Sequence, residues 1–394
     1  MTTLVIRNIA ELTTNDPSIG DESSLGRLRD AAMVVDDQQV LWVGPNATAP
    51  DADESLDANG CAVIPGFVDS HTHLVFAGER SDEFDARMAG VRYDGGGIAR
   101  TVDSTRAASI DDLREGTTKR FAELTAGGVT TVEIKSGYEL TVEGEVRDLR
   151  LAEEFTTETT WLGAHVVPPE YRKDREGYIT VLTSSMLDAC APLAKWADVF
   201  CDRGAFSIDE ARFILEGARE KGLAPRLHAN QLAHSGAIAL AVELDCASVD
   251  HCTYLDDRDI DILSASATVA TLLPGAEFST RSPFPSARRL LDAGVTVALA
   301  TDCNPGSSYV TSMAFVIALA VREMAMSVDE ALWASTKGGA LALRRDDVGH
   351  LGLGARADFA VLDGPRAAHL AYRPGGNVVA QTFRAAFTAT DVST

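Results

Sequence analysis

Lysine is scarce in this chain of 394 residues, which has six lysines among its 35 basic residues. The acidic residues number 58, so the formal net charge is −23. A field this negative repels nucleic acids and anionic membranes, and we expect neither as a partner. The acidic residues are spread along the chain. We therefore favour a solvated surface suited to high salt over the alternative, a functional acidic face.

The chain also lacks long apolar runs and paired cysteines. No run of eighteen apolar residues exists, so no membrane span is expected. The amino terminus has no basic region followed by an apolar stretch, which predicts a cytoplasmic protein. None of the six cysteines forms a Cys-x-x-Cys pair, so we expect reduced thiols. Thiolate ligation near Cys61, Cys252 or Cys303 is disfavoured, because better ligands stand close by.

Apolar runs alternate with segments of helical period from about residue 60 onward. This alternation predicts parallel βα units, and eight of them predict a (β/α)8 TIM barrel, an α/β fold. An open doubly wound sheet would need a Gly-rich phosphate loop after its first strand, and none is present. The eight runs are Ala62–Val68, Val129–Ile134, Thr159–Val167, Ala197–Cys201, Ala224–His228, Ala247–His251, Val269–Leu273 and Val295–Ala300.

The two ends of the chain are turn-rich and predict short strands. We expect residues 1–58 and 346–394 to form one composite β-sandwich domain, with residues 59–345 forming the barrel. Within it we predict strands at Thr3–Ile6, Ala32–Val35, Val40–Val43, His350–Leu353 and Asp358–Leu362. A helix is predicted over Ser327–Leu343, and the acidic stretch Asp51–Asn59 is predicted to be a surface connection.

The first barrel run ends in Asp69-Ser70-His71-Thr72-His73. Residues i and i+2 of a strand point the same way, so His71 and His73 present two imidazoles on one face. Imidazole is a common ligand of zinc and iron. His228 and Asp302 follow the fifth and eighth runs and would complete a metal site at the barrel mouth. The alternatives are hydrogen-bonded loop histidines, a core histidine at His228 and a helix N-cap at Asp302.

Further polar residues stand at other strand ends. His251, beside Asp250, is the candidate proton acceptor, although the two could instead form a structural pair. Arg80 could bind a carboxylate, or it could form a surface ion pair with Glu79 or Glu83. Lys135 could bridge a second metal if carbamylated, but it lies on the second run, so we expect one metal. Residues that could orient a small polar ring are Tyr138, His165, Gln231, Asn304 and Ser307.

The stretches PGFVDSHTHLVFAGERSDEF, EIKSGYEL, LGAHVVPPEY, LHANQL and TDCNPGSS resemble the imidazolonepropionase family of the amidohydrolase superfamily. The resemblance covers nearly the whole chain. It implies one Zn²⁺ or Fe³⁺ per subunit, a small anionic heterocyclic substrate and a homodimer. The implied metal ligands are His71, His73, His228 and Asp302. The implied substrate contacts are Arg80, Tyr138, His165, Gln231, Asn304, Gly306 and Ser307; Tyr93 matches a further family tyrosine.

The implied reaction is hydrolysis of 4-imidazolone-5-propanoate to N-formimidoyl-L-glutamate in histidine degradation. Gln231 cannot act as a base, which leaves His251 and Asp302 to handle protons, while His165 or the metal would steady the oxyanion. One rival is another superfamily member, a cyclic imide hydrolase or heterocycle deaminase. The other is a non-catalytic, metal-free barrel, which would be expected to have lost some of the four ligands.

Overall fold

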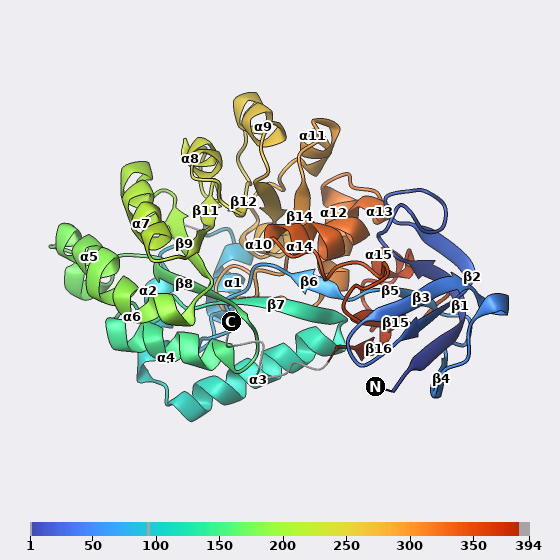
Figure 1. Ribbon diagram of the computed structural model, residues 1–394. Coiled ribbons are helices and arrows are strands. Elements are labelled where there is room, and N and C mark those ends of the chain that lie inside the picture. Colours follow the sequence, from blue (N-terminus) through green and yellow to red (C-terminus); the bar gives the residue numbers. More distant parts are fainter. Residues whose placement is uncertain (1, 93–94, 386–394) are drawn as a thin grey trace.

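The apolar runs form the strands of a parallel barrel in the computed structural model, which describes residues 2–92 and 95–385 (Figure 1). The hydrogen-bonded order is β14-β13-β12-β11-β9-β8-β7-β6, and the short β10 (Ala224–Pro225) also pairs with β9. The predicted barrel is thereby confirmed. Its strands are β6 (Phe67–Asp69), β7 (Val129–Lys135), β8 (Glu158–Ala164), β9 (Trp196–Cys201), β11 (Leu227–Ala229), β12 (Ser248–His251), β13 (Val269–Leu272) and β14 (Val297–Leu299).

Bonds just beyond the strand ends tie the last strand to the first. The backbone N–H of Thr301 donates to Asp69 Oδ1 over 3.0 Å, and that of Asp302 donates to the His71 carbonyl over 3.0 Å. The residues that follow β14 are therefore held beside those that follow β6. This closure brings together two segments that lie more than two hundred residues apart in the chain.

Helices pack around the barrel, and several begin with reciprocal caps. Ser109 and Asp112 form a capping box at α3, as do Ser207 and Glu210 at α7, so two orphan backbone donors are satisfied at each start. The helices are α1 (Ser81–Met88), α2 (Ile98–Ala107), α3 (Ile110–Ala126), α4 (Val142–Glu153), α5 (Arg175–Val181), α6 (Leu187–Cys190), α7 (Ile208–Glu220), α8 (Ala237–Glu243), α9 (Asp257–Ser264), α10 (Pro274–Thr280), α11 (Ala287–Asp292), α12 (Met313–Glu323), α13 (Val328–Trp333), α14 (Gly339–Ala342) and α15 (His369–Tyr372).

Both ends of the chain build a second, mixed sheet beside the barrel (Figure 1). Its order is β16-β15-β5-β1-β2-β3, with β4 pairing to β1. A small apolar cluster that includes Ile9, Met33 and Phe359 packs on it. Its strands are β1 (Leu4–Thr13), β2 (Arg27–Val35), β3 (Val40–Pro45), β4 (Glu54–Asp57), β5 (Ala62–Pro65), β15 (Phe359–Leu362) and β16 (Val379–Phe383). The domain limits at residues 58 and 346 stay a prediction.

The apolar run Ala62–Val68 is two strands in two sheets, and not one barrel strand. β5 pairs with β1 and β15 in the terminal sheet, whereas β6 pairs with β7 in the barrel. Gly66 lies between them, where a Cβ atom would stand 2.2 Å from Thr130 Oγ1. The chain passes from one sheet to the other at a position that has no room for a side chain.

Of three smaller predictions, one is wrong and two hold only in part. His350–Leu353 forms no strand, because the Leu351 N–H bonds to the Thr14 carbonyl and a turn follows at once. Asp51–Asn59 contains β4, which pairs in parallel with β1. Ser327–Leu343 is helical but is interrupted by a π-helical turn over Ala334–Gly338.

Among the described residues, none of the helices is long and apolar enough to cross a membrane. All six cysteines are free thiols, as expected from their spacing. Tyr93 falls outside the described residues.

Candidate active site

Most of the predicted site residues meet in one small cavity at the carboxyl ends of the barrel strands, whereas His71 and Gly306 do not line it. Its volume of about 20 Å³ leaves room for about one water molecule. Ile98 and Phe200 also line it, and neither was predicted from the sequence. The predicted residues that line it are His73, Arg80, Tyr138, His165, Gln231, His228, His251, Asp302, Asn304 and Ser307.

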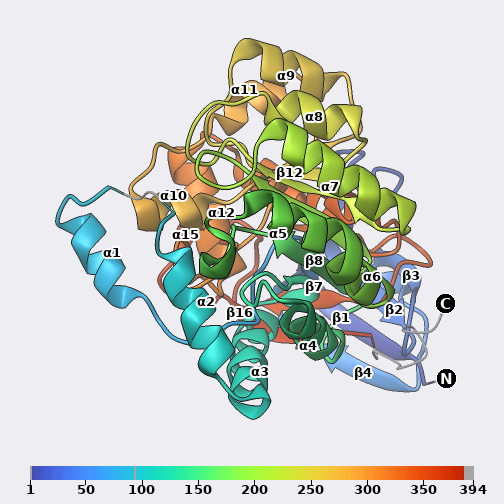
Figure 2. The same cartoon turned by 90° about the vertical axis from the view of Figure 1, so that its left-hand side faces the viewer.

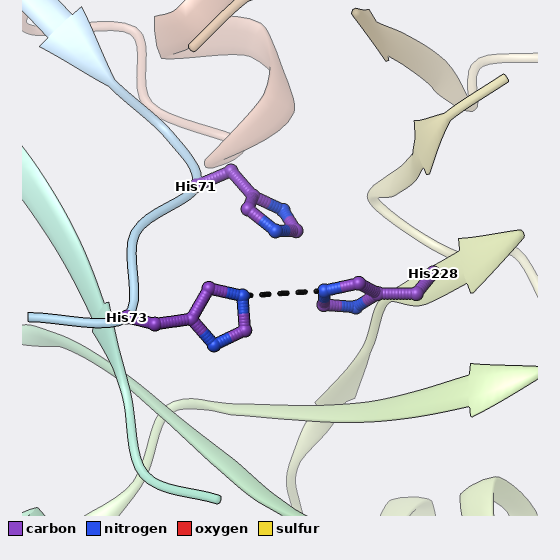
Figure 3. A group of neighbouring side chains, drawn as sticks. All are labelled: His71, His73 and His228. Atoms are coloured by element: carbon purple, nitrogen blue, oxygen red, sulfur yellow. Dashed lines mark hydrogen bonds between the residues drawn. The ribbon is translucent and has the colours of Figure 1, made fainter. Parts of the chain in front are cut away.

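Three histidine rings converge beside this cavity (Figure 3). The ring centroids of His71 and His228 lie 4.4 Å apart. His73 Nε2 faces His228 Nε2 across 3.4 Å, so two lone pairs point at each other unless a cation or proton lies between them. Burial, followed by the positive charge of Lys135, lowers the pKa of His71 well below its usual value, and burial lowers that of His73 likewise. Neutral imidazoles of this kind are metal ligands.

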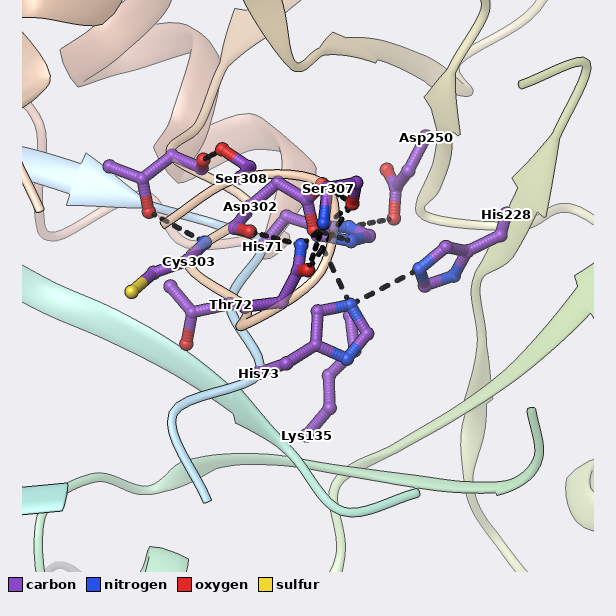
Figure 4. Close-up of polar contacts among 12 residues, drawn as sticks. His71, Thr72, His73, Lys135, His228, Asp250, Asp302, Cys303, Ser307 and Ser308 are labelled. Atoms are coloured by element: carbon purple, nitrogen blue, oxygen red, sulfur yellow. Dashed lines mark hydrogen bonds and ion pairs between the residues drawn. The ribbon is translucent and has the colours of Figure 1, made fainter. Parts of the chain in front are cut away.

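Asp302 supplies the fourth candidate ligand (Figure 4). Its Oδ1 lies 3.6 Å from His71 Nε2 and 3.5 Å from His73 Nε2. Ligand atoms bound at about 2.1 Å in a tetrahedron are about 3.4 Å apart, which matches these separations. His71 Nε2 is buried and has no hydrogen-bond partner among the described residues. His71, His73 and His228 form one group of candidate ligands within 4.8 Å of one another, and Asp302 lies close to two of its members.

Two carboxylates that were missed in the sequence orient these histidines. Asp250 Oδ2 lies 2.8 Å from His71 Nδ1, which fixes the tautomer that leaves Nε2 facing the candidate metal position. Asp198 Oδ2 lies 2.9 Å from His228 Nδ1. Burial opposes ionisation of Asp198, but His228 and Lys135 outweigh it and hold its pKa well below the usual value. In both cases the sequence offered one signal of this role, an aspartate inside an apolar strand.

Lys135 is fixed beneath the site and is not positioned as a metal bridge. Its Nζ lies 2.8 Å from Glu133 Oε1 and 3.0 Å from Asp198 Oδ2, and all three side chains are fully buried. Burial alone would lower the pKa of Lys135, but the two carboxylates raise it above its usual value. A charged lysine so paired is a structural cation, in keeping with the expectation of a single metal.

His251 is buried beside the candidate ligands and belongs to a group with His71 and Asp302 whose ligand atoms lie within 4.8 Å of one another. Asp250 pairs with His71, so the alternative of an Asp250–His251 pair does not hold. Burial lowers the pKa of His251 well below its usual value. The neutral ring can accept a proton.

His165 stacks on His73, with ring centroids 5.5 Å apart. Its Nδ1 lies 2.9 Å from the Gly137 carbonyl, which only accepts, so Nδ1 carries the hydrogen. Burial lowers the pKa of His165 to about 4, so the ring is neutral at neutral pH. Its Nε2 is then an acceptor, and the predicted role of steadying an oxyanion does not fit this geometry.

Arg80 lies between two glycines while it pairs with Glu83. Arg80 Nε donates to Glu83 Oε1 over 2.9 Å and Nη2 to Oε2 over 2.6 Å. A Cβ on Gly97 would stand 1.9 Å from Arg80 Nη2, and one on Gly306 would stand 2.1 Å from Nη1. The ion pair weighed as an alternative is present, but Arg80 is 4% exposed and lines the cavity. The ion pair with Glu83 is therefore confirmed, and binding of a substrate carboxylate by Arg80 stays a prediction.

The loop after β14 is shaped by Asn304. Its Oδ1 accepts the backbone N–H groups of Gly306 and Ser307, each over 2.8 Å, and its Nδ2 donates to the Asp302 carbonyl over 2.7 Å. The Ser307 hydroxyl lies 3.4 Å from Asp302 Oδ2. Both ends of the Asn304 amide are thus engaged within the loop, and its contact with substrate stays a prediction.

The other predicted contacts come from two further loops. Tyr138 is 3% exposed, and its ring lies 5.2 Å from that of His165. Gln231 is held by Asp202, whose Oδ2 accepts the Gln231 backbone N–H over 2.7 Å. The three remaining histidines lie outside the cavity lining, as expected; they are His234, His350 and His369.

Sequence comparison finds relatives that span nearly all of the chain. The amidohydrolase family model matches residues 62–386. The imidazolonepropionase of Salinispora arenicola is 60% identical over 383 residues, covering 97% of this chain and 97% of the relative. The imidazolonepropionase of Mycolicibacterium smegmatis is 59% identical over 384 residues, covering 98% of this chain and 97% of the relative.

Comparison with solved structures finds the same fold at low identity. A variant of atrazine chlorohydrolase from Arthrobacter aurescens, complexed with zinc and atraton, superposes with a TM-score of 0.75 at 17% identity, covering 97% of this chain and 94% of that one. Guanine deaminase from C. acetobutylicum superposes with a TM-score of 0.69 at 15% identity, covering 97% and 98%. These likenesses concern the fold alone.

Proposed function

The chain belongs to the amidohydrolase family, and from this premise we propose that it catalyses the imidazolonepropionase reaction. Water is added across the cyclic amide of 4-imidazolone-5-propanoate, and N-formimidoyl-L-glutamate is formed. Relatives of that name, 59–60% identical over nearly the whole chain, carry the proposal. The buried Arg80 beside the candidate metal ligands supports it, because the substrate bears a propionate that a guanidinium can bind.

His71, His73, His228 and Asp302 would hold one Zn²⁺ or Fe³⁺. When bound, such an ion supplies a Lewis acid and a water acidic enough to be a nucleophile near neutral pH. The orphaned Nε2 of His71 and the separations of 3.4–3.6 Å among the ligand atoms support this assignment.

The proton chemistry falls to His251 and Asp302. One of them takes the proton from water as the new bond forms between the water oxygen and the ring carbonyl carbon. The bond from that carbon to the ring nitrogen then breaks, and the same group returns the proton to the leaving nitrogen. Burial lowers the pKa of His251 and raises the pKa of Asp302, so burial favours the neutral form of both side chains.

His165 orients the ring as a hydrogen-bond acceptor. A neutral imidazole whose Nδ1 donates to the Gly137 carbonyl offers only the Nε2 lone pair to the cavity. It can receive a ring N–H of the substrate, which selects the tautomer that presents its carbonyl to water. Arg80 holds the propionate, while Tyr138, Gln231, Asn304, Gly306 and Ser307 enclose the remainder.

The wider setting is proposed on the same basis. We assign the protein to the cytoplasm, as a homodimer with no nucleic-acid or membrane partner, and its acidic surface to a high-salt environment. We propose two structural units with the predicted boundaries, 1–58 with 346–394 and 59–345, except that β5 (Ala62–Pro65) belongs to the terminal sheet.

An absorbance assay with freshly generated imidazolone propionate tests the function. Metal-loaded protein is expected to consume it, and Arg80→Met is expected to raise KM strongly. A cyclic imide hydrolase or heterocycle deaminase needs no propionate anchor and would be insensitive to Arg80→Met with its own substrate. Absence of turnover by metal-loaded protein would reject the proposal.

A further inference from the structure

The loop between β7 and α4 carries two groups that the proposed function uses, and we call its residues 136–141 the Tyr138 loop. Tyr138 lines the catalytic cavity, with its ring centroid 5.2 Å from that of His165. The Gly137 carbonyl lies 2.9 Å from His165 Nδ1 and so holds that ring in one tautomer. The conformation of the Tyr138 loop therefore decides where two proposed substrate contacts stand.

The backbone of this loop is strained at Leu140, which has a φ of +56°. A left-handed φ is unfavourable for a residue with a Cβ atom, so a leucine stays there only where its surroundings hold it. Leu140 is also buried, so its backbone N–H needs a partner inside the protein. The loop thus depends on an acceptor placed beside Leu140.

Glu145, in the first turn of α4, supplies that acceptor. Its Oε1 accepts the backbone N–H of Leu140 over 2.8 Å and that of Glu139 over 3.2 Å. The Glu145 side chain is fully buried, and α4 packs against β7 and β8, below both strands in the view of Figure 2. One oxygen on the helix therefore holds two successive amides of the loop that leads into it.

Two partly exposed arginines hold the same loop at Glu139. Arg106 Nε donates to the Glu139 carbonyl over 2.7 Å, and Arg147 pairs with the Glu139 carboxylate. Neither bond involves the backbone N–H of Leu140, which donates to Glu145. The strained residue is therefore held by Glu145 and not by the arginines.

We propose that Glu145 is a positioning residue that holds the Tyr138 loop in the conformation that binds substrate. The inference rests on the proposed function, which makes Tyr138 and His165 contacts of the substrate ring. Glu145 does not line the catalytic cavity, so it acts through the loop. The role requires an acceptor oxygen and no negative charge. Burial raises the pKa of Glu145, which disfavours its charged form.

Three variants separate the acceptor from the charge. Glu145→Gln keeps an acceptor oxygen, Glu145→Met has a similar length without one, and Glu145→Asp keeps a carboxylate on a chain one methylene shorter. Glu143→Met is the matched control, because Glu143 is exposed and lies in the same first turn, where its loss affects the helix dipole in the same way.

Three quantities are measured on protein that circular dichroism shows to be folded. They are kcat and KM for imidazolone propionate, zinc affinity by competition with a zinc-binding dye, and hydrogen exchange of the Glu139 and Leu140 amides. In Glu145→Met, KM is expected to rise about tenfold with kcat within about threefold, and the two amides are expected to exchange about tenfold faster. Zinc affinity stays within about twofold, because Glu145 bonds to the loop and not to a candidate metal ligand.

Glu145→Gln and Glu143→Met are expected to keep the wild-type values of all three quantities. Glu145→Asp replaces Glu145→Met if the latter does not fold, and its KM is expected to rise about fivefold, because the shorter side chain cannot reach both amides.

A wild-type KM in Glu145→Met, or in Glu145→Asp if that variant replaces it, overturns the positioning role. So does a rise in KM that is equal in Glu145→Gln and Glu145→Met, since the acceptor would then not matter. A fall in zinc affinity as large as the rise in KM overturns it as well. If metal-loaded wild type does not turn over the substrate, the proposed function fails, and hydrogen exchange still decides the anchor: equal exchange in wild type and Glu145→Met rejects it.

Discussion

Arg80 and Glu83 form a two-bond fork inside the barrel mouth, with Nε–Oε1 and Nη2–Oε2 distances of 2.9 and 2.6 Å. Arg80 is nearly fully buried, while the Glu83 side chain is 28% exposed. The fork holds the guanidinium in one plane beside Gly306, so that the arginine is oriented before a ligand arrives. Glu83 is therefore a positioning residue for Arg80.

Glu83→Gln removes the charge that fixes this plane. We expect KM to rise about tenfold, corresponding to about 1.5 kcal/mol for a charge-assisted bond, with kcat changed less than threefold. Steady-state kinetics with imidazolone propionate measures both. Asp82→Asn is the matched control, because Asp82 precedes Glu83 on α1 and pairs with the exposed Arg100. Equal KM values for Glu83→Gln and wild type would refute the positioning role.

Gly97→Ala tests the position of the Arg80 guanidinium through the glycine that packs against it. Gly97 has φ −73° and ψ −8°, so alanine suits its backbone, but the new Cβ would stand 1.9 Å from Arg80 Nη2. The arginine tip must move, and we expect KM to rise about tenfold while the unfolding temperature stays within about 2 °C. Gly217→Ala, whose Cβ meets only Leu187 Cδ2 at 3.8 Å, should alter neither quantity. A normal KM in Gly97→Ala would mean that Arg80 is not held where the structure has it.

Asp250→Asn addresses the orientation of His71. Loss of the carboxylate at His71 Nδ1 is expected to weaken zinc binding about 10- to 100-fold. Competition with a zinc-binding dye measures the affinity, and circular dichroism checks the fold, since Arg226 also loses a partner at 3.4 Å. Asp198→Asn should weaken binding in the same sense through His228. Asp245→Asn, at an exposed ion pair with Arg344, should not. Wild-type zinc affinity in both buried variants would contradict this assignment.

Glu277 gives the fold a pH dependence. Burial raises the pKa of its carboxyl to about 7, from 4.5, although the Thr253 hydroxyl donates to it over 2.6 Å. A raised carboxyl pKa stabilises the fold below pH 4.5, and this contribution is lost as pH rises through about 7. The variant Glu277→Gln cannot ionise at this position and so keeps its stability as pH rises. Above pH 7 its free energy of unfolding should exceed that of the wild type by about 3 kcal/mol.

Thermal unfolding of wild type and Glu277→Gln at pH 5 and pH 8 provides the comparison. Asp69, whose pKa burial also raises to about 7, contributes equally to both proteins and cancels. A difference between the two proteins that is the same at pH 5 and pH 8 would show that Glu277 does not titrate in this range.

Strand ends and the candidate ligands beside them were predictable because the signals are local. A His-x-His at the end of an apolar run, and single histidines or an aspartate after later runs, place their side chains at one edge once the barrel is inferred. The run Ala62–Val68 shows the limit of this reasoning: nothing in the run marks it as part of two sheets, because its division follows from the pairing of β5 with β1 and β15 and of β6 with β7.

The groups that orient the site could not be assigned in the same way. Asp250 adjoins His251 in sequence, yet its carboxylate pairs with His71, which follows β6. The closed barrel brings the end of β12 near the end of β6, although the two strands are far apart in the chain. The pair of Arg80 with Glu83 lies within one helical turn and was one of the alternatives, but the burial of Arg80 depends on the two glycines that enclose it. Such pairings follow from tertiary packing and not from the sequence nearby.

Anomalous X-ray diffraction from zinc-loaded crystals tests most directly whether one cation is bound both by residues that follow the first barrel strand and by a residue that follows the last. We predict a single strong peak about 2.1 Å from His71 Nε2, His73 Nε2 and His228 Nε2, and from an oxygen of Asp302. A peak bound only by His234, Asp256 and Asp259, the exposed alternative group, or no peak at the barrel mouth, would contradict the account.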